Sequence, residues 1–151
     1  ELDEKNKSNF NNAFEMNIKN IFSFNDKFKL ASRVFLGNSK IKNYELNFND
    51  YIRTYKSFTG ENIITFNLEG RTKLVEINQG MSHYPLFFDN LNLYTYYDLA
   101  YIGNERDYNK TSVIGAELGL EMSQLYGMYT SEIVIGINNE SEIYLRMGKH
   151  F

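Results

Sequence analysis

Two carboxylates, Glu117 and Glu121, are the first side chains in this sequence whose types and spacing could support chemistry. A carboxylate pair is what acid and base catalysis of glycoside hydrolysis requires. In a strand both side chains would lie on one face, but four strand residues separate them by about 13 Å. A glycosidase pair is only roughly 5 to 9.5 Å apart. We therefore interpret both as structural carboxylates on the polar face of a strand.

No other grouping of residues points to catalysis. His83 and His150 lack the partners and the spacing of a metal site or a triad, and no nucleophile elbow, phosphate-binding loop or His-Glu-x-x-His motif occurs. Cysteine is absent, which excludes disulfides and thiolate metal sites. The formal net charge of −3 argues against a nucleic-acid partner. We expect this chain to bind no cofactor and to have no catalytic activity. Any enzyme activity would reside in a domain not present here.

The elements that position the two carboxylates are predicted to be strands, because apolar and polar residues alternate with a period of two along most of the chain. The composition agrees, since 12 tyrosines, 12 phenylalanines and a single proline favour pleated sheets. Turns of Asn-Asp and Asn-Asn type separate several of the segments. About eight antiparallel strands are predicted, with apolar positions over residues 14–24, 28–36, 46–48, 75–81, 91–101, 114–122, 133–137 and 143–151.

One stretch of the chain breaks the alternation. Over residues 55–70 the period is irregular, and its phase changes between Leu68 and Val75. A connection of this length in a compact domain is usually functional or disordered. We therefore predict a single domain over residues 1–151 that carries an inserted loop at this place.

Two inside-out architectures fit the alternation. A soluble barrel or sandwich would turn its apolar face inward, whereas a transmembrane barrel would turn that face to lipid and enclose the polar one. Each predicted strand carries about 10 to 12 alternating residues, which at a tilt of about 40° span about 25 Å, the height of the apolar band of membrane barrels. Glycines share the polar face with carboxylates, and aromatics gather near strand ends. These features favour an all-β, antiparallel transmembrane β-barrel of about eight strands.

The preferred architecture assigns a side to each residue. The cations Arg33 and Arg53 would share the lumen with the carboxylates, as a network or as the lining of a pore. A soluble antiparallel β-barrel that binds an apolar ligand inside remains the alternative. The residues assigned to the lumen are Asp98, Glu117, Glu121, Glu132 and Arg146, and those assigned to lipid are Leu118, Leu120, Met122, Ile133, Ile135 and Ile137.

Four segments carry a resemblance to a known family. They are NQGMSHYPL, TYYDLAYIGN, SVIGAELGLEM and SEIYLRMGKHF, in this order and ending at Phe151. From about Gly60 onward the chain resembles the C-terminal half of the bacterial surface-antigen superfamily of outer-membrane β-barrels. That superfamily includes barrel-assembly proteins, two-partner secretion transporters and barrels fused to patatin-like phospholipases. Its members show patterns like E-x-R-x-P-L, F-x-D-x-G-x-V and G-x-E-L before a last strand that ends in Phe.

The resemblance implies a location, partners and a function. The chain would lie in the bacterial outer membrane, in contact with lipid, and would anchor or translocate an attached or partner polypeptide. Its last strand would be the signal recognised by the barrel-assembly machinery. The family also has a long loop whose V-R-G-F or V-R-G-Y tip places an arginine in the lumen, and the comparable stretch here, ENIITFNLEG, has no arginine. The residues of the assembly signal are Ile143, Leu145, Met147 and Phe151.

Closure of the barrel is a separate question. The family barrel has about sixteen strands, so the eight predicted here would be half of it, unless they close alone as a small barrel. If the chain closed alone, residues 143–151 would run antiparallel to residues 13–24. The sixteen-strand pattern favours the other case, in which both edges meet a missing barrel half or a second copy of the chain.

Overall fold

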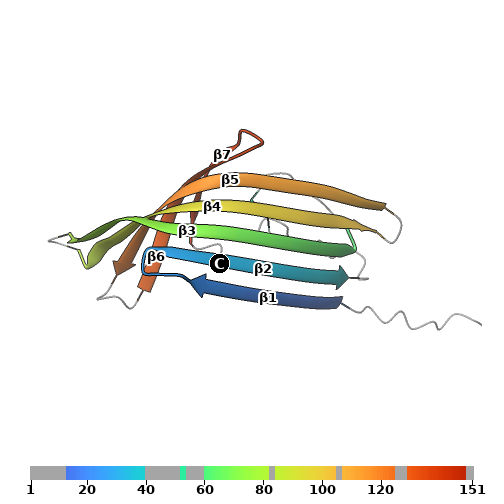
Figure 1. Ribbon diagram of the computed structural model, residues 1–151, viewed down its shortest axis with the longest axis horizontal. Helices are drawn as coiled ribbons and strands as arrows, with labels where there is room; N and C mark the ends of the chain where they lie inside the picture. The colour runs from blue at the N-terminus through green and yellow to red at the C-terminus, as the bar shows by residue number, and fades with distance from the viewer. Residues whose placement is uncertain are drawn as a thin grey trace, which may run out of the picture.

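The computed structural model describes residues 13–39, 52–53, 60–81, 84–104, 107–124 and 129–148. These residues form one antiparallel sheet of seven strands in the order of the sequence (Figure 1). The all-β, antiparallel prediction is therefore confirmed, while the predicted strand at residues 46–48 lies outside the described residues. The strands are β1 (Ala13–Ser23), β2 (Phe28–Ser39), β3 (Asn62–Gly80), β4 (Leu86–Asn104), β5 (Asp107–Gln124), β6 (Tyr129–Asn138) and β7 (Ile143–Met147).

The sheet curls but does not close. In Figure 1, β6 and β7 pass behind the layer formed by β1 to β5. Strand β1 pairs with β2 and β7 pairs with β6, and no pairing joins β1 to β7. Because every neighbouring pair is antiparallel, the first and seventh strands run in the same direction. The expectation that residues 143–151 run antiparallel to residues 13–24 is therefore wrong for the described strands, since it assumed an eighth.

Asparagine side chains shape two of the hairpin turns. The Oδ1 atom of Asn25 accepts hydrogen bonds from the backbone N–H groups of Lys27 at 2.9 Å and Phe28 at 2.8 Å, which confirms the predicted turn after β1. Between β6 and β7, Asn138 Oδ1 accepts from the backbone N–H groups of Glu140 at 3.0 Å and Glu142 at 3.1 Å. These bonds replace the backbone pairing that is lost where the chain reverses.

The predicted inserted loop is largely strand. Residues 62–70 form the first half of β3, so the loop prediction over residues 55–70 is wrong from residue 62 onward, and residues 54–59 lie outside the described part. The change in the phase of the apolar alternation, which suggested a loop, is caused by a β-bulge. The pairing of β3 with β4 shifts register between Lys73 and Val75. A bulge adds a residue to one strand and reverses the faces of those that follow without ending the strand.

The exposed face of the sheet carries apolar residues, whereas charged residues are buried on the other face. Ile133, Ile135 and Ile137 on β6 are exposed, whereas Glu132 and Val134, which alternate with them, are 1% and 0% exposed. Leu118 is exposed as predicted, and Leu120 is half-buried. Met122 was predicted on the apolar outer face, but it is buried beside the register shift between Phe88 and Asn90, where the alternation is broken.

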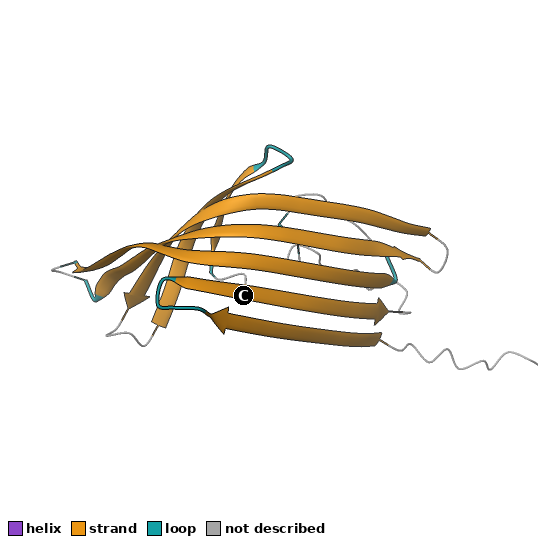
Figure 2. Ribbon diagram, viewed as in Figure 1, coloured by secondary structure: helices purple, strands orange, loops and turns teal. Residues whose placement is uncertain are grey.

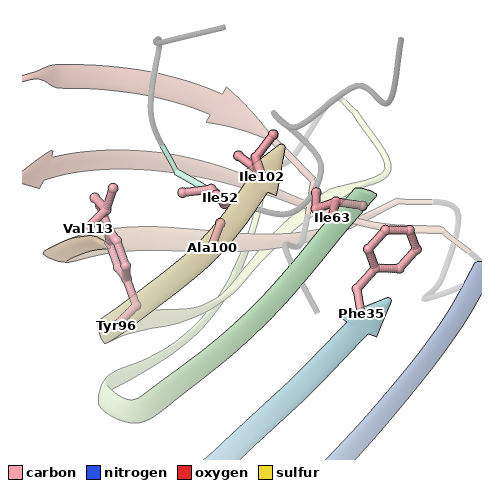
Figure 3. Close-up of a cluster of buried hydrophobic side chains, with 7 residues drawn as sticks. All are labelled: Phe35, Ile52, Ile63, Tyr96, Ala100, Ile102 and Val113. Atoms are coloured by element: carbon pink, nitrogen blue, oxygen red, sulfur yellow. The ribbon is translucent and has the colours of Figure 1, made fainter. Parts of the chain in front are cut away.

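A small apolar cluster lies at the end of the sheet where β2 stops and β3 starts (Figure 3). Ile52 lies among side chains from four strands there, although it belongs to the segment that connects β2 to β3. Figure 2 shows only strands and loops in the described part of the chain, where no helix is long and apolar enough to cross a membrane. The cluster consists of Phe35, Ile52, Ile63, Tyr96, Ala100, Ile102 and Val113.

Candidate functional site in the polar interior

The inner face of the sheet carries charged and amide side chains at its centre. Register pairs Arg33 with Asn67 and Asn67 with Asp98, so these three form one row across β2, β3 and β4. All are buried, with Asn67 and Asp98 at 0% exposure. Arg33 Nε donates to Asn67 Oδ1 at 3.0 Å, and Asn67 Nδ2 donates to Asp98 Oδ1 at 2.8 Å. The row satisfies polar groups that would otherwise be costly to bury.

Arg53 lies at the centre of the inner face and comes from the connection between β2 and β3. Its guanidinium group forms an ion pair with Glu69, and its Nε lies 3.6 Å from Glu117 Oε1 and 4.0 Å from Asp98 Oδ2. The guanidinium carbon lies 4.0 Å from the centre of the Tyr96 ring, which is a cation–π contact. One arginine therefore faces three carboxylates from three different strands.

Backbone bonds also hold this segment in the interior. The Arg53 N–H donates to Asp98 Oδ2 at 3.1 Å, so both carboxylate oxygens of Asp98 accept hydrogen bonds. The Arg53 carbonyl accepts from Asn138 Nδ2 at 3.2 Å. With Ile52 in the apolar cluster, residues 52 and 53 are fixed by side-chain and backbone contacts together.

A second arginine, Arg146 on β7, shares the carboxylate of Glu117. Arg146 Nη2 lies 2.7 Å from Glu117 Oε2, and Arg146 Nε donates to Glu117 Oε1 at 3.2 Å, so the ion pair is bidentate. The Tyr144 hydroxyl lies 2.7 Å from Glu117 Oε1 and 2.9 Å from the Tyr96 hydroxyl. Glu117 thus joins the segment at residue 53 to the edge strand β7.

Glycines on β5 and β6 make space for these tyrosines. A Cβ atom at Gly136 would lie 2.5 Å from Tyr144 Cζ, and one at Gly115 would lie 2.4 Å from the Tyr96 hydroxyl. At Gly119 an added Cβ would come within 2.5 Å of Glu132 Oε1. The glycines that the sequence places on the polar face therefore accommodate large inner side chains.

Glu121 belongs to a different group of side chains, further toward the turn that follows β3. Arg71 Nη2 donates to Glu121 Oε2 at 3.0 Å, and Asn90 Nδ2 donates to the same oxygen at 3.1 Å. These residues line an open polar cavity of about 760 Å³, together with Lys27 and Lys29 of the first hairpin. Glu117 and Glu121 therefore have separate cationic partners, as their predicted spacing requires.

The predicted lumen residues fall into three groups. Asp98 and Glu117 face Arg53, and Arg146 pairs with Glu117. Glu121 pairs with Arg71, while Glu132 Oε1 accepts hydrogen bonds from the Tyr94 hydroxyl and Asn92 Nδ2. The residues of the predicted assembly signal on β7, Ile143, Leu145 and Met147, lie on its exposed face, and Phe151 lies outside the described residues.

The sequence did not predict that Arg53 is the centre of the network. The stretch ENIITFNLEG, to which the family's loop tip was assigned, is mostly strand β3, and the interior arginine comes from the preceding Y-I-R-T-Y. In the sequence, Arg53 is marked only as a single arginine between tyrosines in the segment that connects β2 to β3. Arg53 was expected on the side of the carboxylates, and it lies beside Glu69 and Asp98 there. Because no strand period applies within a connection, its carboxylate partners could not be predicted.

The arrangement can dock a connecting segment against the sheet through paired charges. In the described ranges no group of three His, Cys, Asp or Glu side chains could hold a metal ion. Comparison of the chain with protein-family models, with curated proteins and with solved structures finds no match.

Proposed function

We propose that this chain is an outer-membrane β-barrel domain of the surface-antigen type, which anchors or translocates an attached or partner polypeptide. The observation that carries the proposal is that the sheet buries charged residues and exposes apolar ones. Charged residues such as Asp98 and Glu117 are 0% and 1% exposed, while Ile135 and Leu145 are 56% and 67% exposed. A face of exposed aliphatic residues over a buried ionic network suits a protein whose outer solvent is lipid.

The soluble alternative fits these observations less well. A barrel that binds an apolar ligand needs an apolar interior, whereas the centre of this inner face holds Arg33, Arg53 and Asp98. Large exposed apolar patches on a soluble protein mark interfaces or aggregation-prone surfaces. Here exposed apolar residues occur on all seven described strands, which is a band rather than a patch.

Arg53 supports the family resemblance. The family places an arginine from a long loop inside the lumen, and the connection between β2 and β3 brings Arg53 to Glu69 and Asp98. Asp98 lies in the segment TYYDLAYIGN, which is one of the four that carry the resemblance. Under this proposal, Arg53 would take the place of the arginine that the stretch ENIITFNLEG lacks.

The location is tested by fractionation together with site-directed labelling. Because the chain has no cysteine, single cysteines can be placed at Leu118 and Ile135 on the outer face and at Tyr108 and Thr130 as controls near strand ends. We expect the protein to need detergent for extraction and to migrate differently on an unheated gel. A fluorophore at residue 118 or 135 should be quenched by lipid-borne quenchers more strongly than at the controls. Recovery of folded protein in the aqueous supernatant would contradict the proposal.

A further inference from the structure

The polar cavity beside Glu121 has a volume of about 760 Å³ and lies apart from the ionic network around Arg53. In the described part of the chain, every residue that lines it is polar or charged. Cavities of roughly 300 to 1,000 Å³ hold small organic ligands, and their polar groups set which ligand fits. A lining of this kind suits a hydrophilic ligand. Because the cavity is on the inner face, its ligand does not depend on what covers the outer face.

Four cations form a compact block in the lining of this cavity. Register pairs Lys29 of β2 directly with Arg71 of β3. Next to them, the backbone N–H of Lys73 donates to the carbonyl of Lys27 at 2.8 Å, which holds the end of the first hairpin against β3. All four residues line the cavity. Like charges directly opposite each other destabilise a sheet, so a bound anion would relieve a repulsion that the fold itself creates.

The carboxylates of the lining neutralise only part of this block. Neither Lys27 nor Lys29 forms an ion pair with another described residue, and only Asp26, in the turn beside them, offsets their charge within the lining. Both lysines are exposed, and a lysine ammonium on its flexible stem can move onto a ligand. The two ion pairs of the lining, at 3.0 and 3.9 Å, are Arg71–Glu121 and Lys73–Glu76.

Two amide side chains line the cavity beside the cations. Register pairs Asn92 with Lys73, and Asn92 is only 1% exposed, so packing restricts its position. Asn92 Nδ2 donates to Glu132 Oε1 at 3.5 Å, and Asn90 Nδ2 donates to Glu121 Oε2 at 3.1 Å. These bonds use the amide nitrogens and leave the amide oxygens as acceptors for hydroxyl groups. The lining therefore combines sites for an anion with sites for hydroxyls.

We propose that this cavity binds a small phosphorylated polyol, such as a sugar phosphate. Its phosphate group accepts charge-assisted hydrogen bonds from Lys27, Lys29 and Arg71, and its hydroxyl groups donate to Asn90 and Asn92. A phosphate monoester carries a charge of about −1.5 to −2 at neutral pH, which matches the two lysines that have no ion pair. Inorganic phosphate would use only the cations, and a neutral sugar only the amides.

The test is calorimetric titration of the complete gene product, in an uncharged detergent at low salt, with glycerol 3-phosphate, glucose 6-phosphate, inorganic phosphate and glucose. Lys29→Gln and Lys27→Gln each remove one cation, and Lys29→Arg keeps it. Lys19→Gln is the matched control, because Lys19 is an exposed cation of β1 outside the lining. Asn90→Ala removes a hydroxyl acceptor. Circular dichroism and migration on an unheated gel check that each variant is folded.

We expect both phosphorylated polyols to bind more tightly than inorganic phosphate, and glucose not to bind. Lys29→Gln and Lys27→Gln should each weaken binding about tenfold or more, since a hydrogen bond to a charged group contributes that much. Lys29→Arg and Lys19→Gln should bind as the parent protein does. Asn90→Ala should weaken binding of the polyol phosphates and leave that of inorganic phosphate unchanged.

Four results would overturn the proposal. Failure of both polyol phosphates to bind excludes the ligand class. Equal losses in Lys29→Gln and Lys19→Gln show attraction by overall charge, without a site. Inorganic phosphate that binds as tightly as glucose 6-phosphate shows a site for the anion alone. Displacement of glucose 6-phosphate by phosphatidylglycerol added to the micelles shows that the phosphate belongs to a lipid headgroup and not to a soluble polyol.

Discussion

Arg146 on β7 and Glu117 on β5 form an ion pair of 2.7 Å across β6, the strand that lies between them. The same carboxylate lies 3.6 Å from Arg53 Nε. Strand β7 has only five residues, and among the described strands it pairs with β6 alone, so few backbone bonds hold it there. Its inner side chains therefore contribute much of its attachment to the sheet.

Glu117→Gln should destabilise the sheet strongly. The substitution leaves Arg146 and Arg53 without the carboxylate that they share, and breaking a buried pair by removing one partner costs about 3 to 5 kcal/mol. The control is Glu121→Gln, because the pair of Glu121 with Arg71 is more exposed and should contribute about 1 kcal/mol or less. Urea unfolding in detergent micelles measures both changes. Equal losses in the two variants would contradict the central role of Glu117.

Gly136→Ala should loosen β7. The new methyl group would lie 2.5 Å from Tyr144 Cζ, and overpacking of this kind typically costs about 1 to 3 kcal/mol. Gly70→Ala is the matched control, since its closest contact is Thr95 Oγ1 at 3.1 Å. The exchange rate of β7 amides reports the effect. Adding Tyr144→Ala to Gly136→Ala should restore part of the lost stability, and a purely additive double mutant would count against the contact.

Arg53→Ala should release residues 52 and 53, in the connection between β2 and β3, from the interior. It removes the cation that faces Glu69, Asp98 and Glu117. We expect chymotrypsin to cleave near residue 53 faster than in the parent protein, while Lys27→Ala, which changes an exposed cation, leaves the rate unchanged. Unaltered cleavage of the Arg53 variant would show that the backbone contacts suffice.

Ile135→Arg tests the outer face energetically. If residue 135 lies near the middle of a bilayer, an arginine there costs about 2 to 4 kcal/mol. On a water-exposed surface the same change would alter the free energy of unfolding by about 0.5 kcal/mol or less. Ile135→Phe is the control that keeps the position apolar. Reversible unfolding in lipid vesicles distinguishes the two cases, and a small effect there would contradict lipid contact.

The sequence predicted the faces of the strands better than their ends. Alternation placed Ile133, Ile135 and Ile137 opposite Glu132 correctly, because a strand turns each successive side chain to the other face. It failed between Leu68 and Val75, since a bulge and a loop both change the phase of an alternation. Only the pairing partner on β4 distinguishes the two, and a single sequence does not contain that pairing.

The centre of the site was harder to predict for a different reason. Asp98 and Glu117 lie on strands, so their side followed from the period. Arg53 lies on a connection, where no period applies, and its position depends on contacts with residues up to 85 positions away along the chain, as in its bond from Asn138. The sequence marked the residue as a cation but could not show which carboxylates it would meet.

The residues of the ionic network are synthesised in a fixed order, which affects how the domain assembles. Arg53 is synthesised first, then Glu69, Asp98 and Glu117, and Arg146 comes last. Until β7 arrives, Glu117 has only the more distant of its two arginines, at 3.6 Å rather than 2.7 Å. Strand β7 therefore supplies the nearer of the two cations that face Glu117, and a chain interrupted before Tyr144 would hold a poorly compensated carboxylate at its centre.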